Sequence, residues 1–284
     1  MTKLQKIMLP ILAVLCALVM SVDLTVYKAL FVNPERVHVT YKTITDPLIP
    51  SSMNDISVVY ISDLEYGEFG GMEQTQKLID KINSLQSDLF LFGGDVFSEN
   101  ITPSADQISQ MSAWLGSIEA PLGKFAVFGE QDLIDQTRTD TIRQIMHDAG
   151  IEILENRSLP ITNFGSGQIR LAGLSPEADV EAACAGMVAD QFNLVLSHYP
   201  DNLMSDRLDL FPISYALAGN AHGTQITWPF KGGYRKWTGS TEYNRARKRK
   251  LSFKNYLTSG VGCIKVDARL NAPVEIVYML LSSR

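Results

Sequence analysis

The chain has 284 residues, 45% of them hydrophobic and 20% charged, with a formal net charge of −6. Its length suits one sizeable domain with a well-filled core. The acidic balance argues against a general nucleic-acid binder, which normally carries a basic excess, so we expect no nucleic-acid partner and a local site for any anionic substrate.

The first segment of the chain, residues 1–32, is predominantly apolar. Residues 7–22 contain no charge; Lys3 and Lys6 precede them and Asp23 follows. A run of this length fits both a long signal-peptide core and a short transmembrane helix. No clear cleavage site follows it, and the preceding lysines favour a cytoplasmic N-terminus. We therefore expect an uncleaved single-pass anchor in the cell membrane with the rest of the chain outside the cytoplasm, and a cleaved signal peptide is the alternative.

Residues 33–52 are predicted to form an edge strand and a linker. Residues 37–45 alternate apolar and polar side chains, as an edge strand does, and Pro47, Pro50 and two serines follow. The remaining chain, residues 53–284, is expected to form the main domain.

Five short apolar runs recur along this domain, and each ends in polar residues. They lie in the segments ISVVYISDLE, DLFLFGGDV, KFAVFGEQD, FNLVLSHYPD and ISYALAGNAHG. Continuous apolar runs of this length suit strands that are buried on both faces of a sheet. Helical patterns lie between them, over residues 72–86, 105–118 and 139–150. Alternating strands and helices predict an α/β fold whose ligands bind beyond the carboxyl ends of the strands.

The segment of residues 231–250 is rich in basic side chains with aromatic residues around and between them. The basic residues are Lys231, Arg235, Lys236, Arg245, Arg247, Lys248, Arg249 and Lys250, and the aromatic ones are Trp228, Phe230, Tyr234, Trp237 and Tyr243. This mixture fits a rim that meets anionic lipid head groups or a phosphorylated substrate. It equally fits a solvated loop whose charges balance acids elsewhere in the chain.

Acids, amides and histidines gather at the ends of the five apolar runs. In chain order they are Asp63, Glu65, Asp95, Glu130, Gln131, Asp132, His198, Asn220 and His222. Each residue taken singly has an ordinary interpretation as part of a turn or of the core. Together, so many carboxylates and imidazoles at one edge would be expensive to bury without a cation among them. Mixed oxygen and imidazole ligands therefore predict one or two divalent metal ions, which can bind a phosphate ester and activate water.

The order and spacing of these motifs resemble the calcineurin-like metallophosphoesterase family, and within it a membrane-anchored bacterial branch. The resemblance runs from about residue 37 to the end of the chain and rests on ISDLE, GGDV, FGEQD, LSHYPD and GNAHGTQ. It implies a layered β-sandwich flanked by helices. It also implies that the protein hydrolyses a phosphoester or pyrophosphate with metal-activated water.

Several positions depart from the motifs of the family. The resemblance implies a first metal site of Asp63, Glu65, Asp95 and His222, in which Glu65 replaces a histidine. It implies a second site of Asp95, Glu130, His198 and Asn220, in which Glu130 replaces an asparagine and Asn220 replaces a histidine. Because oxygen ligands replace imidazoles, manganese or magnesium becomes the favoured ion, with iron or zinc as alternatives.

The most consequential departure is Gln131, which stands where the family has the histidine that protonates the leaving group. An amide can orient a phosphate oxygen, but it has no proton to give at neutral pH. Loss of a general acid typically costs about 10² to 10⁴ in rate, and esters with good leaving groups suffer least. Asp132 is the other candidate at this catalytic position, and proton donation would require a strongly raised pKa.

Two functions are consistent with this pattern. One is a membrane-anchored phosphoesterase that acts on a phosphorylated small molecule or a lipid-linked substrate. The other is a catalytically weak or inactive pseudoenzyme that serves as a cell-surface binding or structural module. The retained aspartates and histidines favour the enzyme, whereas Glu65 and Gln131 favour the pseudoenzyme.

Overall fold

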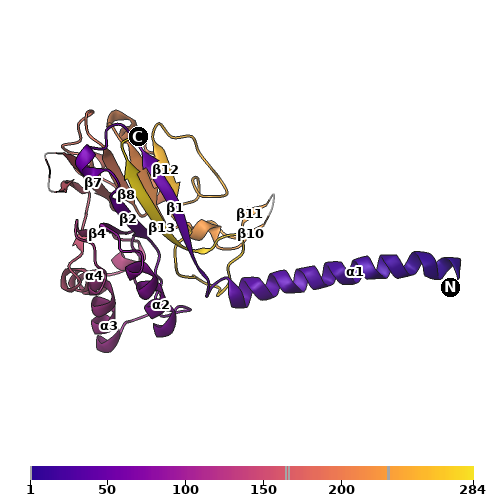
Figure 1. Ribbon diagram of the computed structural model, residues 1–284. Coiled ribbons are helices and arrows are strands. Elements are labelled where there is room, and N and C mark those ends of the chain that lie inside the picture. The colour runs from indigo at the N-terminus through magenta and orange to yellow at the C-terminus, as the bar shows by residue number, and fades with distance from the viewer. Residues whose placement is uncertain (1, 164, 166, 229–230) are drawn as a thin grey trace.

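Two β-sheets stacked face to face form the centre of the structure, and helices cover their outer faces (Figure 1). This computed structural model describes residues 2–163, 165, 167–228 and 231–284, so Phe230 of the basic and aromatic segment lies outside the described residues. The arrangement is a layered α/β sandwich, as the family resemblance implies.

The larger sheet has six strands in the order β1-β13-β2-β3-β4-β5. Their bounds are β1 Val37–Thr45, β2 Ser57–Ile61, β3 Leu89–Phe92, β4 Lys124–Ala126, β5 Glu152–Ile153 and β13 Val274–Ser282. Strands β2 to β5 run parallel to one another, while β13 pairs antiparallel with β2 and parallel with β1. Strand β1 lies at the edge of the sheet, which agrees with its alternating sequence.

The smaller sheet has five strands in the order β12-β9-β8-β7-β6. Their bounds are β6 Arg157–Thr162, β7 Gln168–Leu174, β8 Asn193–Ser197, β9 Tyr215–Ala218 and β12 Lys254–Leu257. Strands β7, β8, β9 and β12 run parallel, and β6 pairs antiparallel with β7. Strands β10 (Thr227–Trp228) and β11 (Gly232–Gly233) pair antiparallel and form a separate two-stranded sheet.

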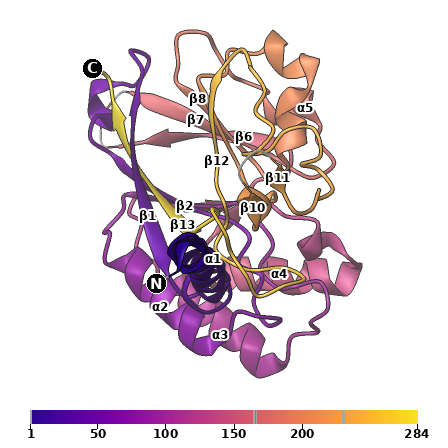
Figure 2. The same ribbon diagram turned by 90° about the vertical axis from the view of Figure 1, so that its right-hand side faces the viewer.

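Three helices cover the larger sheet and one short helix lies on the smaller sheet (Figure 2). Their bounds are α2 Met72–Asn83, α3 Ala105–Gly116, α4 Gln136–Asp148 and α5 Val180–Ala183. The shorter 3₁₀ turns are η2 Ser51–Met53, η3 Gln131–Leu133, η4 Pro200–Met204, η5 Asp206–Leu210 and η6 His222–Thr224. Helix α4 begins earlier than its sequence pattern predicts because Asp135 caps it, accepting the backbone N–H of Arg138 at 2.8 Å.

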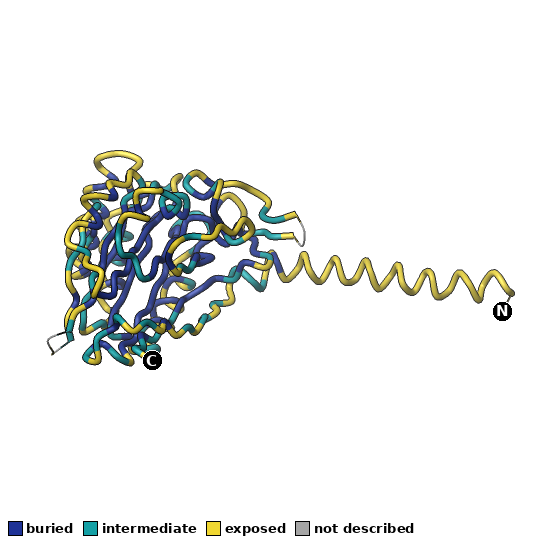
Figure 3. Tube along the Cα trace, turned by 90° about the horizontal axis from the view of Figure 1, so that it is seen from above, coloured by how far each residue is buried: buried dark blue, intermediate teal, exposed yellow. Residues whose placement is uncertain are grey.

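The continuous apolar runs are explained by burial on both faces of the larger sheet. In β3, Phe90 and Phe92 pack toward α2, α3 and α4, whereas Leu89 and Leu91 pack against the smaller sheet. All four side chains are fully buried. Figure 3 shows buried segments of the chain running through the centre of the domain. Each strand is therefore held from both sides, and its polar end is fixed at one edge of the sandwich.

The N-terminal helix α1 (Lys3–Tyr27) continues into the π-helical turn η1 (Lys28–Val32) and projects from the domain (Figure 1, Figure 3). Among the described residues it is the one helix long and apolar enough to cross a membrane, with a mean hydropathy of 2.5. Its base is attached to the domain by two hydrogen bonds. The backbone N–H of Arg269 donates to the carbonyl of Ala29, and Nδ2 of Asn33 donates to the carbonyl of Arg269, both at 2.8 Å.

Candidate metal centre

The residues predicted as metal ligands lie at the carboxyl ends of strands from both sheets. Asp63 and Glu65 follow β2, Asp95 follows β3, Glu130 follows β4, His198 follows β8, and Asn220 and His222 follow β9. Strands β2, β3 and β4 belong to the larger sheet, and β8 and β9 belong to the smaller one. The candidate site therefore forms where the ends of the two sheets meet.

Asp63, Asp95 and His198 form one part of the site. One ligand atom from each lies within 4.8 Å of the others, and all three residues are buried. Nδ1 of His198 is hydrogen-bonded to the carbonyl of Gly93 at 2.6 Å, so Nε2 is directed at Oδ2 of Asp95 (3.3 Å) and Oε2 of Glu130 (2.7 Å). An imidazole fixed at Nδ1 by a carbonyl presents Nε2 as a metal ligand. The structure thus brings these four predicted ligands together.

Glu65 and His222 form the other part. Nδ1 of His222 lies 3.2 Å from the carbonyl oxygen of Gly262, and Nε2 lies 3.8 Å from Oε1 of Glu65. Nε2 of Gln131 donates to the same carboxylate oxygen at 3.3 Å. The second oxygen, Oε2, is buried and accepts no hydrogen bond from any described residue. Because an unsatisfied buried carboxylate oxygen is costly and a cation would satisfy it, the residues present fit a divalent metal ion.

Asn220 connects the site to a neighbouring loop. Its backbone N–H donates to both carboxylate oxygens of Asp63, at 2.9 and 3.1 Å. Its side-chain nitrogen Nδ2 donates to the carbonyl of Thr238. The side-chain oxygen Oδ1 is consequently the atom of Asn220 that could bind a metal.

Asp132 is bonded to the backbone of the loops that hold two of the predicted ligands. Its carboxylate accepts N–H groups from Asp95 (2.8 Å), Val96 (3.0 Å) and Gly129 (2.9 Å). Burial raises the pKa of Asp132, and these three hydrogen bonds oppose the rise. A catalytic role for Asp132 stays a prediction, and its contacts favour a role in positioning Asp95 and Glu130.

The loops that follow the strands hold most of the predicted ligands in a left-handed backbone conformation. The φ angles are 58° at Asp63, 50° at Glu65, 61° at Asp95, 58° at Asn220 and 45° at His222. Residues other than glycine adopt this conformation rarely, each at a cost of order 1 kcal/mol or more. Such strain persists where surrounding contacts hold it, and it is concentrated at functional sites.

Two of these loops also approach each other closely. Gly94 has a φ angle of 93°, and a Cβ atom placed on it would lie 2.3 Å from the backbone nitrogen of Gly129. Only glycine tolerates both conditions, so Gly94 allows the loops that carry Asp95 and Glu130 to meet.

Electrostatics at the site reflect a group of buried anions. Burial raises the pKa of Glu65 and of Asp95 well above the usual range, and nearby carboxylates raise it further. Burial acts to lower the pKa of His198, but Asp95 and Glu130 outweigh it and raise that pKa well above its usual value. Burial lowers the pKa of His222. These shifts indicate that positive charge among the ligands would be strongly favourable.

The stability of the metal-free protein is expected to fall as pH rises from about 5 to 9. This range begins above the ordinary carboxyl pKa and ends above the ordinary imidazole pKa. The pKa values of Glu65, Asp95 and His198 are raised in the folded state, so that state binds more protons than the unfolded chain in this window. The lowered pKa of His222 opposes this trend near the ordinary imidazole pKa, and the lowered pKa of Glu130 opposes it only in more acidic solution. Three raised pKa values against one lowered value leave a net fall. Bound Mn²⁺ should reverse the trend, because its ligands bind in their deprotonated forms.

Differential scanning fluorimetry at several pH values measures how the melting temperature changes with pH, both for chelator-treated and for Mn²⁺-loaded protein. Parallel slopes in the two samples would contradict a metal site at these residues.

A cavity of about 370 Å³ opens beside the predicted ligands. It is lined by Glu99, Glu130, Gln131, Ile134, Tyr199, Arg235, Lys236, Trp237, Thr238, Ile264 and Lys265. The sequence did not single out Tyr199 or Lys265, although Tyr199 directly follows His198. The sequence marks Arg235 and Trp237 only as members of a basic and aromatic segment.

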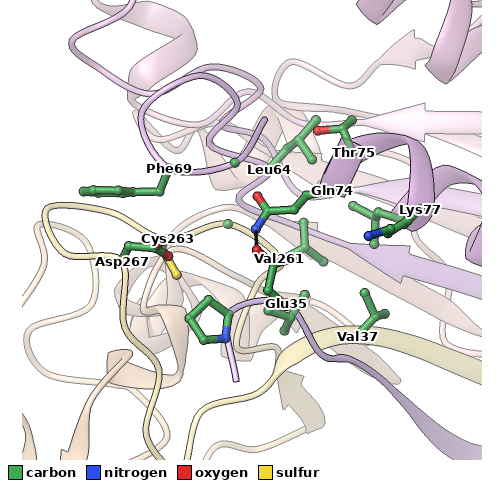
Figure 4. Close-up of a pocket in the computed structure, with 15 residues that line it drawn as sticks. Glu35, Val37, Leu64, Phe69, Gln74, Thr75, Lys77, Val261, Cys263 and Asp267 are labelled. Carbon is green, nitrogen blue, oxygen red and sulfur yellow. Dashed lines mark hydrogen bonds between the residues drawn. The ribbon is translucent and has the colours of Figure 1, made fainter. Parts of the chain in front are cut away.

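A second and smaller cavity lies near the base of α1, next to residues 34–37 (Figure 4). Its lining includes Phe69, Cys263 and Asp267, and none of the predicted ligands, all of which the structure describes, takes part in it. Its volume of about 50 Å³ has room for only a few water molecules. The larger of these two cavities borders the predicted ligands and is therefore the candidate for substrate binding.

Three arginines at the far end of the basic segment pair with neighbouring acids. Arg245 pairs with the buried Glu275 at 3.0 Å, and Arg247 and Arg249 pair with Glu242 at 3.0 and 3.1 Å. This part of the segment matches the interpretation in which its charges balance acids within the domain.

Comparisons with known proteins add an independent line of evidence. No protein-family model matches the chain. The uncharacterized metallophosphoesterase YkuE of Bacillus subtilis (strain 168) is 25% identical over 259 residues, which cover 90% of this chain and 89% of that protein. The uncharacterized metallophosphoesterase Cj0846 of Campylobacter jejuni is 25% identical over 250 residues, or 84% of this chain and 62% of that protein. The UDP-2,3-diacylglucosamine pyrophosphatase LpxG of Chlamydia muridarum is 22% identical over 228 residues, or 63% of this chain and 67% of that protein.

An α/β sandwich with acids and histidines converging at its strand ends is the architecture of a metal-dependent phosphoesterase. Two of these relatives are named as metallophosphoesterases and the third as a pyrophosphatase, and the first matches nearly the whole chain. These similarities, which extend over most of the chain, support a calcineurin-like metallophosphoesterase family.

Proposed function

We propose that the protein is a membrane-anchored, metal-dependent phosphoesterase whose domain, residues 53–284, lies outside the cytoplasm. Its substrate is a phosphoester or a pyrophosphate, either as a small molecule or linked to a lipid. The main support is the buried group of Asp63, Asp95 and His198, whose ligand atoms lie within 4.8 Å of one another at the edge of the sandwich.

Two ions would divide the predicted ligands between them. Asp63, Glu65, Asp95 and His222 would hold one, and Asp95, Glu130, His198 and Asn220 would hold the other. When bound, such ions polarise a phosphate group and lower the pKa of water. The preference for oxygen ligands favours manganese or magnesium over zinc.

The residues around the ligands have separate tasks. The carbonyls of Gly93 and Gly262 orient the two imidazoles, and Asp132 fixes two ligand loops through backbone hydrogen bonds. Gln131 contacts Glu65 and lines the larger cavity, so its amide can orient a substrate oxygen. It has no proton to donate to a leaving group.

Helix α1 supports a membrane location. Its 25 residues extend about 37 Å, which exceeds the roughly 30 Å hydrocarbon core of a bilayer. None of them is buried against the domain, and Lys3 and Lys6 at its start favour a cytoplasmic N-terminus. The intact mass of protein extracted from membranes checks this, and a mass that lacks α1 would contradict an uncleaved anchor.

A pseudoenzyme is the second candidate, and Gln131 is the residue that favours it. Its side chain is 3% exposed and bonded to Glu65, so the amide has a fixed orientation at the position where the family resemblance implies a proton donor. A protein that had kept its metal ligands but lost this donor could bind a phosphorylated partner without cleaving it.

Metal analysis of the full chain in detergent, followed by assay of an activated phosphodiester with Mn²⁺, distinguishes the two functions. The phosphoesterase predicts bound divalent metal and hydrolysis that a chelator abolishes. Bound metal without hydrolysis would favour the pseudoenzyme, and the absence of both would refute a metal-dependent enzyme.

A further inference from the structure

The larger cavity combines acidic and basic groups. Glu130 lies in its lining together with three basic residues, Arg235, Lys236 and Lys265. Lys265 pairs with Glu99. Within the part of the chain that the structure describes, no carboxylate lies at ion-pair distance from Arg235 or Lys236. Two cations without acidic partners therefore line a cavity that borders the predicted metal ligands.

Arg235, Lys236 and Trp237 form what we call the basic shelf. The guanidinium carbon of Arg235 lies 4.8 Å from the centroid of the Trp237 ring, which is a cation–π contact. The same ring lies 5.8 Å from the ring of His222. The next residue in the chain, Thr238, accepts a hydrogen bond from the side chain of Asn220. The basic shelf is thus held against two of the predicted ligands.

The indole N–H of Trp237 is a buried donor that has no acceptor among the described residues. Trp237 is 7% exposed and lines the cavity, and its Nε1 atom makes no hydrogen bond to any residue that the structure describes. A buried donor without a partner is destabilising, so its presence here points to an acceptor from outside the chain. An N–H group beside two cations suits an anionic phosphate oxygen.

The residue at the proton-donor position restricts the leaving group. With Gln131 there, an alkoxide would have to depart without a proton. A departing phosphate has no such need, because its second pKa is about 6 and it is largely ionised at neutral pH. The charge that develops on its oxygens can instead be stabilised by fixed cations and N–H donors.

We propose that the basic shelf binds the departing phosphate of a diphosphate diester, which makes a pyrophosphate-linked compound the substrate class; this inference rests on the proposed phosphoesterase function. Water oxygen forms a bond to one phosphorus atom, and the bond from that phosphorus to the bridging oxygen breaks. The electron pair stays on the bridging oxygen, which leaves as part of a phosphate monoester. Two phosphate monoesters result, and both protons of the water pass to solvent when these products are fully ionised.

Kinetics of the full chain with Mn²⁺ on two substrates test this assignment. One substrate is a nucleoside diphosphate sugar, and the other is a p-nitrophenyl phosphodiester, which has no second phosphate. Arg235→Gln is expected to lower kcat/KM about 10- to 100-fold on the diphosphate. The factor by which it lowers kcat/KM on the nitrophenyl ester should be at least about tenfold smaller. Trp237→Phe keeps the ring beneath Arg235 and removes only the N–H, with an expected loss of about fivefold to tenfold on the diphosphate.

Lys248→Ala is the matched control. Lys248 belongs to the same basic segment, is exposed and is absent from the lining of the cavity. It should leave kcat/KM unchanged on both substrates.

A lipid-linked diphosphate in detergent micelles, assayed beside the soluble one, identifies which source of diphosphate the site takes. Arg235→Gln should impair cleavage of whichever diphosphate is the substrate.

Binding gives a readout that does not depend on turnover. Isothermal titration with methylenediphosphonate, a diphosphate that cannot be hydrolysed at its bridge, should show about tenfold weaker binding to Arg235→Gln than to the unaltered protein. Equal losses of kcat/KM on the two substrates, or unchanged binding of methylenediphosphonate, would overturn the role of the basic shelf. Failure of the unaltered protein to cleave either substrate would instead overturn the proposed function.

Discussion

Asp95→Asn is expected to reduce metal-dependent phosphodiester hydrolysis by at least about 10³-fold, because Asp95 is the predicted ligand common to both ions and several kcal/mol of metal stabilisation depend on it. An asparagine fits the left-handed backbone at this position, where φ is 61°. Its side-chain oxygen can still accept the backbone N–H of Gln131, which Asp95 accepts at 2.9 Å. The loss should therefore reflect changed metal binding rather than a misplaced loop.

The same substitution is expected to have the opposite effect on stability. Burial and the neighbouring Glu130 raise the pKa of Asp95, so its ionised form is unfavourable in the metal-free protein at pH 8. Removal of that charge should raise the metal-free melting temperature by a few degrees, as about 1 kcal/mol shifts it by roughly 2 to 4 °C in a domain of this size.

Melting curves with and without Mn²⁺, together with metal analysis, measure both effects of Asp95→Asn. Asp190→Asn removes an exposed carboxylate and is the control. If Asp95→Asn retained both its metal content and its activity, the metal would have to bind elsewhere.

Gln131→His is expected to raise the rate on alkyl phosphodiesters by about 10²-fold, and much less on p-nitrophenyl esters, because it would supply a general acid for poor leaving groups. The backbone at this position is held by the bond to Asp95, and the side chain contacts Glu65. An imidazole there would lie beside a carboxylate, which raises the imidazole pKa and favours the protonated donor.

Gln131→Asn is the control for this substitution, since it changes the shape of the side chain without adding a proton donor. Gln131 donates to Glu65 in the structure, so the two positions are coupled. The rate gain of the double variant Glu65→His, Gln131→His should therefore exceed the product of the gains of the two single variants. Steady-state rates on the two classes of ester decide the matter. A similar gain on both classes would mean that Gln131 affects catalysis by some route other than proton donation.

The sequence predicted the strands that are buried on both faces better than those that are half exposed. Strand β3 is apolar throughout and was recognised from its composition, as were β8 and β9. Strand β6, with the sequence RSLPIT, exposes Arg157 and Thr162 and contains a proline, so neither periodicity nor composition marked it. Its place in the sheet comes from pairing with β7, a long-range contact that local sequence does not report.

The candidate site was predictable in its residue types and not in its connections. Polar residues at the ends of parallel strands converge for topological reasons, which is why Asp63, Asp95 and His198 could be predicted to meet. The sequence could not show that Asp132 would bond three backbone N–H groups, since the pattern gives a residue type and not its partners. Nor could it show that the loop bearing Trp237 folds back over the ligands, because that loop has no regular periodicity.

The backbone geometry of the ligand loops restricts how this site can diverge. A left-handed residue accepts glycine, asparagine or aspartate readily and rejects β-branched side chains. At position 220, where the family resemblance implies a histidine, this chain has asparagine, one of the residues that a φ angle of 58° tolerates best. Lineages of this fold can therefore exchange one ligand chemistry for another while the loops keep their course. Changes of metal preference or loss of turnover should arise in evolution well before the architecture itself is lost.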